Sequence, residues 1–392
     1  MVTAAIDRAA IHGVCDSRLQ GVRDAFAENF AQGGEVGATV AVTVDGKLVV
    51  DLWAGHADAA RTRPWTRDTI VDVASSTKGL TTICAHRLVD AGLLDLEAPV
   101  ARYWPEFAQA GKATIPAHFL LSHRAGLPAI DEPLPTEALY DWNRMTGALA
   151  AQKPWWAPGT RHGYHIFTFG YLVGEVVRRI TGKTLGTYFR EEVAEPLGLD
   201  CHVGLVAEHD ARVAEFLAFP PPPPGQPDVL GALLKQAGPM IEKAHLNPPW
   251  TFADRNTRAW RAAEIPAGNA HTAARALARV YGALACGGEI DGVRVLNPAS
   301  IERARTVQDT GPDAVLFGLP TRFGLGFSLP FNGVGFGAAS PSAFGCPGGG
   351  GSIGFADPEA RVGFGYVMNQ AQDAMPPDPR ALRLIDALYA SL

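Results

Sequence analysis

Valine recurs at every second position in one stretch near the start of the chain. Within VGATVAVTVDGKLVVDLWAG, residues 36–55, the valines stand at 40, 42 and 44, and Asp45-Gly46 follows them. A two-residue period is typical of a strand with one buried face, and Asp-Gly is a preferred two-residue hairpin turn. The pattern therefore predicts a β-hairpin over residues 36–55.

A second hairpin is predicted near the C-terminus. The segments SIGFAD (352–357) and RVGFGYVMN (361–369) lie on either side of a turn at Asp357-Pro358-Glu359. The second segment places its large side chains on one face of a strand, namely Val362, Phe364, Tyr366 and Met368. A helix is expected from about Pro379, with Asp378 as its N-cap.

Between the hairpins the apolar spacing is helical. It predicts helices from about Leu80 to Gly92, over 172–180 and over 272–286. We expect an α+β fold, with one antiparallel sheet built from both chain ends, flanked by helices, and an inserted mostly helical domain. The predicted division is a discontinuous sheet domain, 1–80 and 282–392, and a helical domain, 81–281, with the active site between them.

A proline run interrupts the helical region. FPPPPPG, residues 219–225, is incompatible with a helix interior or a central strand. We interpret 219–265 as a Pro-rich loop and variable segment. It carries Trp250, Phe252 and Trp260. The first two are candidate substrate-binding residues, with core packing as the alternative.

Composition excludes several classes of protein. The chain has 392 residues, 47% of them hydrophobic, and a net charge of −6 without a dense basic stripe, which argues against a nucleic-acid partner. Asp7 and Arg8 interrupt any signal-peptide core, and no apolar run is long enough for a membrane span. The five scattered cysteines lack the spacing of a zinc site. We therefore expect a cytoplasmic protein without a cofactor or a metal.

Two serines compete for the role of nucleophile. Ser352 lies in GGSIG, which matches the Gly-x-Ser-x-Gly pattern of α/β-hydrolases. In those enzymes an acid and then a histidine follow the serine, whereas the last histidine here is His271. Ser352 also begins a predicted strand instead of ending one. The pentapeptide is therefore interpreted as a coincidence of a glycine-rich stretch.

Ser75 has the more suitable surroundings. In DVASSTKGLT it precedes Lys78 by three residues, so a helix would place both on one face. Free N–H groups at a helix start favour a developing negative charge. A serine needs a base, and Lys78 can serve only when neutral, which requires lowering its pKa by about 3 units. The alternative is an N-cap serine beside a solvated lysine.

Several segments resemble the serine β-lactamase and penicillin-binding-protein superfamily, and most closely the family VIII carboxylesterases, which share the class C β-lactamase fold. The segment around Ser75 is similar to the family's nucleophile helix, and LLSHRAGLP (120–128) to its Leu-Leu-Thr-His-Thr-Ser-Gly-Leu stretch. Residues 157–185 resemble the segment with the catalytic tyrosine, and 344–369 the third-motif hairpin. These motifs occur in the family's order over most of the chain.

The resemblance implies an acyl-enzyme mechanism and a β-lactamase-like fold. Ser75 would attack the ester carbonyl, and Lys78 and Tyr164 would share the roles of general base and general acid. Which of the two removes the serine proton is left open. The oxyanion hole would use the backbone N–H groups of Ser75 and Gly349.

Two motifs depart from the β-lactamase pattern. Where those enzymes have Tyr-x-Asn, this chain has Tyr164-His165-Ile166, and isoleucine cannot bind a substrate amide. Where they have Lys-Thr-Gly, this chain has Cys346-Pro347-Gly348, which offers no cation for a carboxylate. The groups that recognise a carboxylated amide are absent, whereas the nucleophile and proton-transfer groups remain.

These departures favour a carboxylesterase for short-chain esters. The alternatives are a β-lactam hydrolase or D-alanyl peptidase on the same scaffold, and a non-catalytic binding or regulatory member. Cys346, Gly348 and His165 join the candidate substrate-binding residues, and the other histidines, His123, His162 and His271, are expected to be structural. A small-molecule ester is the expected partner, without nucleic acid or membrane, and the oligomeric state is left open.

Overall fold

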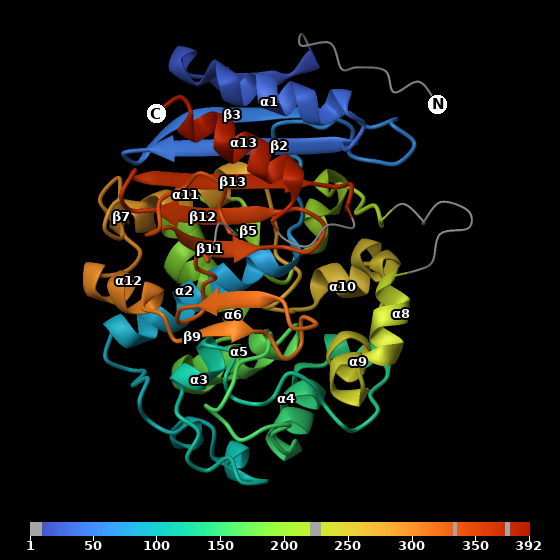
Figure 1. The fold of residues 1–392 in the computed structure, drawn as a ribbon, viewed down its shortest axis with the longest axis vertical. Helices are drawn as coiled ribbons and strands as arrows, with labels where there is room; N and C mark the ends of the chain where they lie inside the picture. Colours follow the sequence, from blue (N-terminus) through green and yellow to red (C-terminus); the bar gives the residue numbers. More distant parts are fainter. Residues whose placement is uncertain (1–9, 220–228, 332–334, 373–376) are drawn as a thin grey trace.

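One antiparallel sheet joins the two ends of the chain. The computed structural model describes residues 10–219, 229–331, 335–372 and 377–392. The sheet has the strand order β1-β3-β2-β13-β12-β11, so that β2 from the N-terminal hairpin pairs with β13 from the C-terminal one (Figure 1). Its strands are β1 His12–Cys15, β2 Gly37–Val44, β3 Lys47–Gly55, β11 Phe344–Pro347, β12 Ile353–Asp357 and β13 Val362–Met368.

Both predicted hairpins are confirmed. Asp45 and Gly46 have φ values of 51° and 74°, the positive values that a two-residue hairpin turn of this type requires. In the second hairpin Asp357 pairs with Val362. The large residues of β13 pack in one buried cluster with Val40 and Val42 of β2. The two-residue period therefore predicted both hairpins, but not a single buried face, because every residue of β13 and all but the last of β2 are buried.

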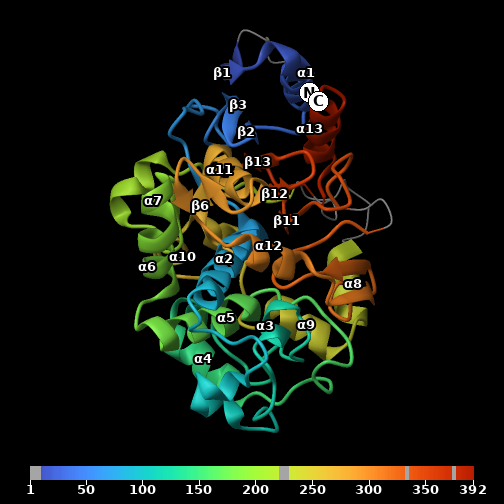
Figure 2. The same cartoon turned by 90° about the vertical axis from the view of Figure 1, so that its left-hand side faces the viewer.

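Helices cover both faces of this sheet. Helix α1 (Gln20–Ala31) contacts α13 (Pro379–Tyr389) on one face, and α11 (Ala274–Ala285) packs on the other (Figure 2). The close approach of α11 depends on glycine, because a Cβ at Gly363 would lie 2.2 Å from the backbone nitrogen of Gly282. The Asp378 side chain caps α13 by accepting a hydrogen bond from the N–H of Arg380, as predicted.

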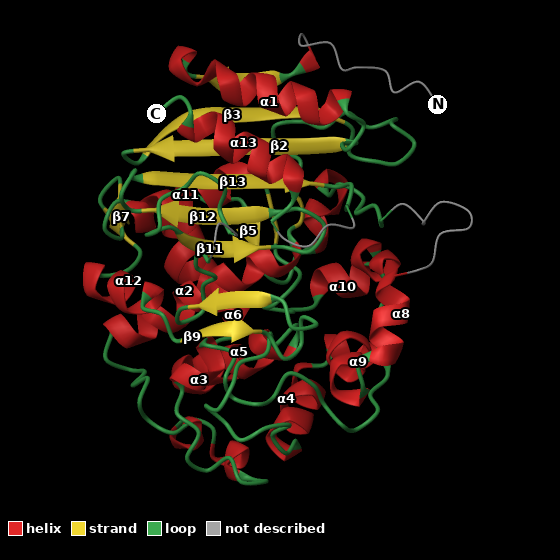
Figure 3. Cartoon of the chain, in the orientation of Figure 1, coloured by secondary structure: helices red, strands yellow, loops and turns green. Residues whose placement is uncertain are grey.

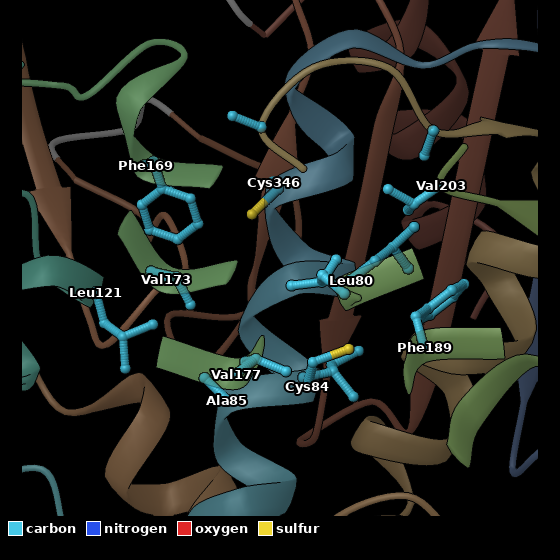
Figure 4. Packing of buried hydrophobic residues seen from close by; sticks show 14 of the residues in the cluster. Leu80, Cys84, Ala85, Leu121, Phe169, Val173, Val177, Phe189, Val203 and Cys346 are labelled. Atoms are coloured by element: carbon cyan, nitrogen blue, oxygen red, sulfur yellow. The ribbon is translucent and has the colours of Figure 1, made fainter. Parts of the chain in front are cut away.

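The inserted region is mostly helical and surrounds α2 (Thr77–Asp90) (Figure 3). Side chains of α5 and α6 pack against α2, which is buried along nearly its whole length (Figure 4). The other helices are α3 His118–Leu121, α4 Trp142–Ala151, α5 Thr168–Thr181, α6 Leu185–Phe189, α7 Glu195–Leu197, α8 Val229–Gln236, α9 Pro239–Leu246, α10 Arg258–Ala262 and α12 Pro298–Arg305. Short strands are β4 Val71–Asp72, β5 Cys201–His202, β6 His271–Thr272, β7 Glu289–Ile290, β8 Val293–Arg294, β9 Asp309–Pro312 and β10 Pro320–Phe323.

The interpretation of residues 219–265 as a loop is wrong for most of that range. Residues 229–262 hold α8, α9, a 3₁₀ turn at Phe252–Asn256 and α10. Most of the proline run lies outside the described residues. The prolines and aromatics concealed the short helices, because an element of five to eight residues offers too few turns for a clear apolar period. The predicted domain boundaries fall inside α2 and α11, and the division stays a prediction.

Candidate active site

Ser75 lies in a tight turn that leads into α2. The turn is the 3₁₀ element Ala74–Ser76, and Ala74 adopts a φ of 46°, which is unusual for a residue other than glycine. The N–H of Ala74 donates to Oδ1 of Asp72 at 2.7 Å, and the hydroxyl of Thr77 donates to the carbonyl of Ala74 at 2.6 Å. These two bonds hold the turn so that Ser75 faces a cavity while its chain neighbours are buried.

Lys78 is buried beneath Ser75, and only 2% of it is exposed. Its Nζ lies 3.2 Å from Oγ of Ser75 and donates to the carbonyls of Ile166 at 2.8 Å and Ala267 at 2.9 Å. The pKa of Lys78 is lowered to about 7, chiefly by burial, and the nearby Arg255 cation contributes in the same direction. A neutral amine has two hydrogens for the two carbonyls, which leaves its lone pair for the Ser75 hydroxyl.

Tyr164 completes the cluster and is held by a residue that sequence reasoning missed. The backbone N–H of Tyr164 lies 3.0 Å from both oxygens of Asp313, which also accepts from the N–H of Val315 at 2.8 Å. Nζ of Lys78 lies 4.5 Å from the centre of the Tyr164 ring. Burial raises the pKa of the phenol, and a hydrogen bond with the Ser75 side chain partly offsets this. Tyr164 is therefore protonated at neutral pH.

Ser75 and Tyr164 open onto an apolar cavity of about 570 Å³. Gly349 also lines it, and a Cβ added there would meet no atom within 4 Å, so the backbone at Gly349 is open to the cavity. The volume is that of a site for a small organic molecule. Most of the wall consists of large apolar side chains, among them Leu316, Leu319, Phe323, Leu329, Phe331 and Phe336.

Ser352 is buried behind this site. Its hydroxyl donates to the carbonyl of Val73 at 2.7 Å and lies 3.2 Å from Oγ of Ser76. Ser76 in turn donates to the carbonyl of Cys346. Ser352 therefore ties the strand after the glycine-rich turn to the segment that carries Ser75, which is a structural role.

The three predicted substrate-binding residues of the second and third motifs, His165, Cys346 and Gly348, do not line this cavity. Cys346 lies beside Lys78 and Tyr164, and burial raises its pKa to about 12, so its thiol is neutral. Gly348 is not among the residues that line the cavity, and a Cβ there would lie 2.2 Å from Oγ of Ser352. His165 is fully buried, and its Nε2 accepts from the N–H of Leu127 at 3.1 Å. The structure thus gives His165 and Gly348 packing roles instead of substrate contacts.

Trp250 and Phe252 also differ from expectation, because neither lines the cavity. Their rings lie 5.3 and 5.8 Å from the guanidinium of Arg255, together with Trp260 at 5.3 Å and Phe216 at 4.7 Å. Arg255 is nearly buried and pairs with Asp72, with its Nη1 2.6 Å from Oδ1. The aromatic cluster therefore stabilises a cation behind the nucleophile turn.

The Asp72–Arg255 ion pair connects the turn that carries Ser75 with the segment whose carbonyl binds Lys78. Asp72 accepts from Ala74, next to Ser75, and from Nε1 of Trp260 at 2.7 Å. Arg255 reaches the carbonyl of Gly268 at 3.4 Å, next to the Ala267 carbonyl that binds Lys78. No motif in the sequence pointed to Arg255, because its partner lies 183 positions away.

A second buried arginine holds the glycine-rich turn of residues 348–351. Nη2 of Arg380 donates to the carbonyl of Gly350 at 2.9 Å, and its Nη1 donates to the carbonyl of Gln370 at 3.0 Å. Its charge is balanced by Glu35 at 3.0 Å and Asp378 at 2.8 Å. The start of α13 thereby fixes the turn that carries Gly349.

The histidines expected to be structural are nearly or fully buried. Nδ1 of His123 accepts from the N–H of His165 at 3.1 Å, and Nε2 of His162 lies 2.8 Å from the Thr321 hydroxyl. Across the described residues, no group of three or more His, Cys, Asp or Glu side chains is arranged to hold a metal ion. Within the same residues, no helix has both the length and the apolar character needed to cross a membrane.

Comparisons with known proteins agree with one another. A family model described as Beta-lactamase matches residues 22–388. The chain is 39% identical over 366 residues to Esterase/beta-lactamase LipL of Mycobacterium tuberculosis, which covers 92% of this chain and 83% of that protein. A family VIII carboxylesterase structure is 43% identical with a TM-score of 0.91, and covers 97% of this chain and 100% of its own. A penicillin-binding protein homolog from Caulobacter crescentus is 40% identical with a TM-score of 0.89, at the same coverage.

We predict that Arg255→Met will alter both stability and proton affinity at the site. The variant leaves Asp72 buried without its cation, which costs about 3–5 kcal/mol in the free energy of unfolding. It also removes a positive charge that lowers the pKa of Lys78. The acid limb of ester hydrolysis should therefore move to higher pH, measured as kcat/KM from pH 5 to 9, with urea denaturation for stability.

The matched control is Arg258→Met, which changes a half-exposed arginine paired with Asp210. This control should leave the acid limb in place. An unchanged acid limb in a folded Arg255→Met protein would contradict the electrostatic part of this prediction.

Proposed function

Because the chain belongs to the beta-lactamase family, we propose that it is a serine carboxylesterase that hydrolyses short-chain carboxylic esters through an acyl-enzyme on Ser75. One observation carries the proposal. A desolvated lysine amine gives its hydrogens to two backbone carbonyls and faces a serine hydroxyl at the wall of an apolar cavity. This is the arrangement that turns a serine into a nucleophile.

In the proposed first step Lys78 is the general base. It takes the hydroxyl proton as Oγ of Ser75 attacks the ester carbonyl and forms a tetrahedral oxyanion. The high pKa of Tyr164 supports this assignment, because a protonated phenol cannot accept the serine proton. The carbonyls of Ile166 and Ala267 keep the amine in place and also stabilise the ammonium that results.

Tyr164 is the proposed general acid. Its phenol gives a proton to the leaving alcohol as the tetrahedral intermediate collapses to the acyl-enzyme, and the proton taken by Lys78 restores the phenol. Water then attacks the acyl carbon with the same groups acting in reverse order. Tyr164 lines the same cavity as Ser75, and the Ser75 side chain is near enough to lower the pKa of the phenol, which supports proton exchange near Oγ.

The oxyanion would bind the backbone N–H groups of Ser75 and Gly349. Ser75 belongs to the first turn before α2, where N–H groups are free of helical partners. Gly349 borders the same cavity as Ser75, on the turn held by Arg380. Backbone donors fixed in this way need no reorganisation as charge develops.

An ester is favoured over a β-lactam by the residues around the nucleophile. Ile166 presents an apolar side chain to the cavity where an amide-binding asparagine would stand, and Cys346 is neutral. The relatives described as carboxylesterase and esterase/beta-lactamase agree with this preference. A β-lactam hydrolase is the second candidate, because the latter relative's description includes that activity.

We predict that Ser75→Ala abolishes hydrolysis of p-nitrophenyl butyrate, with a loss in kcat of at least about 10³-fold, because no other nucleophile is activated. Ser352→Ala is the matched control and should retain measurable activity, since Ser352 supports the site only structurally. Mass spectrometry after labelling with a fluorophosphonate should place the adduct on Ser75. An unlabelled wild-type chain would instead support a non-catalytic role.

The pH dependence should report the protonation of Lys78. Below a pH of about 7 the amine carries a proton and cannot accept another, so kcat/KM should fall by about tenfold per pH unit. Above that pH the activity should level off, because Tyr164 remains protonated. The measurement is kcat/KM on p-nitrophenyl butyrate from pH 5 to 9, with circular dichroism to monitor folding. A flat profile across this range would contradict Lys78 as the base.

Substrate preference separates the two candidate functions. We expect kcat/KM to be higher for p-nitrophenyl butyrate than for the cephalosporin nitrocefin by about tenfold or more, because Ile166 leaves the side-chain amide of a β-lactam without a hydrogen-bond partner. Steady-state rates on both substrates under one set of conditions provide the test. A clear preference for nitrocefin would reverse the conclusion drawn from Ile166 and Cys346.

A further inference from the structure

Arg322 is the one charged side chain among the described residues that line the apolar cavity. The remainder of that wall is apolar, apart from small hydroxyl groups, glycines and Tyr164. A charged group in such a wall normally orients a ligand, because the apolar surface around it supplies affinity without direction. Arg322 is half-buried, so it is shielded in part from water and remains accessible.

The backbone of Arg322 is held by strand β9 and by the segment around Leu329. It pairs with Thr310 of β9, and its carbonyl accepts from the N–H of Leu329 at 2.9 Å. The next residue, Phe323, stacks on the Tyr164 ring with a centroid distance of 6.1 Å. Adjacent Cα atoms in a chain are about 3.8 Å apart, so Arg322 stands one residue from a side chain that contacts the catalytic cluster.

The guanidinium of Arg322 has spare donors. Its Nη1 donates to the carbonyl of Pro330 at 3.3 Å, a long bond to a neutral acceptor. No carboxylate of the described residues forms an ion pair with it, whereas Arg255 and Arg380 are each paired within 3.0 Å. A planar guanidinium with free N–H groups is suited to a carboxylate, which it can bind through two parallel hydrogen bonds.

We propose that Arg322 is a specificity-determining residue that binds a carboxylate carried by the ester substrate. The preferred substrates are then esters with a second, ionised acid group, such as monoesters of short dicarboxylic acids. This inference rests on the proposed esterase activity and refines its substrate class. Cys346 stands where related enzymes have a cationic third-motif residue, so in this chain the anion-binding group would come from Arg322 of β10, which lines the cavity.

The test compares substrates that differ in one charge. The first arm sets 4-nitrophenyl hydrogen adipate against 4-nitrophenyl heptanoate, which places the carboxylate on the acyl part. The second arm sets 4-carboxyphenyl butyrate against phenyl butyrate, which places it on the alcohol part. Rates without enzyme are subtracted, and kcat and KM are measured separately. In at least one arm the wild-type protein should prefer the anionic ester by roughly tenfold or more in kcat/KM.

Arg322→Gln should abolish this preference, measured as the ratio of kcat/KM for the anionic ester to kcat/KM for the neutral ester of the same arm. Arg322→Lys should retain part of it, since the charge remains without the planar fork. The matched control is Arg303→Gln, which removes the same charge from an exposed position on α12 and should leave the preference unchanged.

The outcomes distinguish the inference from the function on which it rests. If neither neutral nor anionic esters are hydrolysed, the proposed esterase function fails. If neutral esters are hydrolysed and neither anionic ester is preferred, the function stands and the role of Arg322 is refuted. A preference that survives in a folded Arg322→Gln protein would equally refute it.

Discussion

The removal of one lysine amine from water is the constraint on which the site depends. An ordinary lysine is charged at neutral pH and cannot accept a proton. Burial of Lys78 in the centre of the fold disfavours the charged form, and two carbonyls take up the hydrogens of the neutral form. Those carbonyls come from segments far from α2 in the sequence, at Ile166 and Ala267. The fold therefore has to bring three distant parts of the chain together before Lys78 can act as the proposed base for Ser75.

Two buried arginines, Arg255 and Arg380, hold the segments of the site in fixed positions relative to one another. Arg255, surrounded by aromatic rings and paired with Asp72, connects the turn that carries Ser75 with the segment that binds Lys78. Arg380, paired with Glu35 and Asp378, holds the turn that carries Gly349. Leaving any one of these charges unpaired would be costly in so apolar a setting, which makes the geometry of each pair strict. Arg322 differs from both, because it faces the cavity without an acidic partner among the described residues.

Membership of the beta-lactamase family explains the fold. The proposed preference for esters rests on two residues that depart from the β-lactamase motifs, Ile166 and Cys346. The family accommodates relatives described as esterases and as penicillin-binding protein homologs on closely similar backbones. Function therefore has to be argued from the residues at the site instead of from the fold. In this chain the nucleophile cluster is joined to an apolar wall at Ile166 and a neutral thiol at Cys346, a combination suited to esters.

The sequence by itself determined both hairpins and the longer helices, and it indicated the candidate residues for the chemistry. Alternating valines and Asp45-Gly46 predicted the first hairpin, and the spacing of Ser75 and Lys78 indicated one helical face, because these features depend on neighbours within a few residues. Tertiary structure alone decided which distant groups meet. In the structure Trp250 and Phe252 pack against the guanidinium of Arg255 instead of lining the cavity. Asp313 accepts a hydrogen bond from the backbone N–H of Tyr164, and Asp72 pairs with Arg255 across 183 positions. Such contacts leave no local pattern, because a side chain's role in them depends on packing between elements.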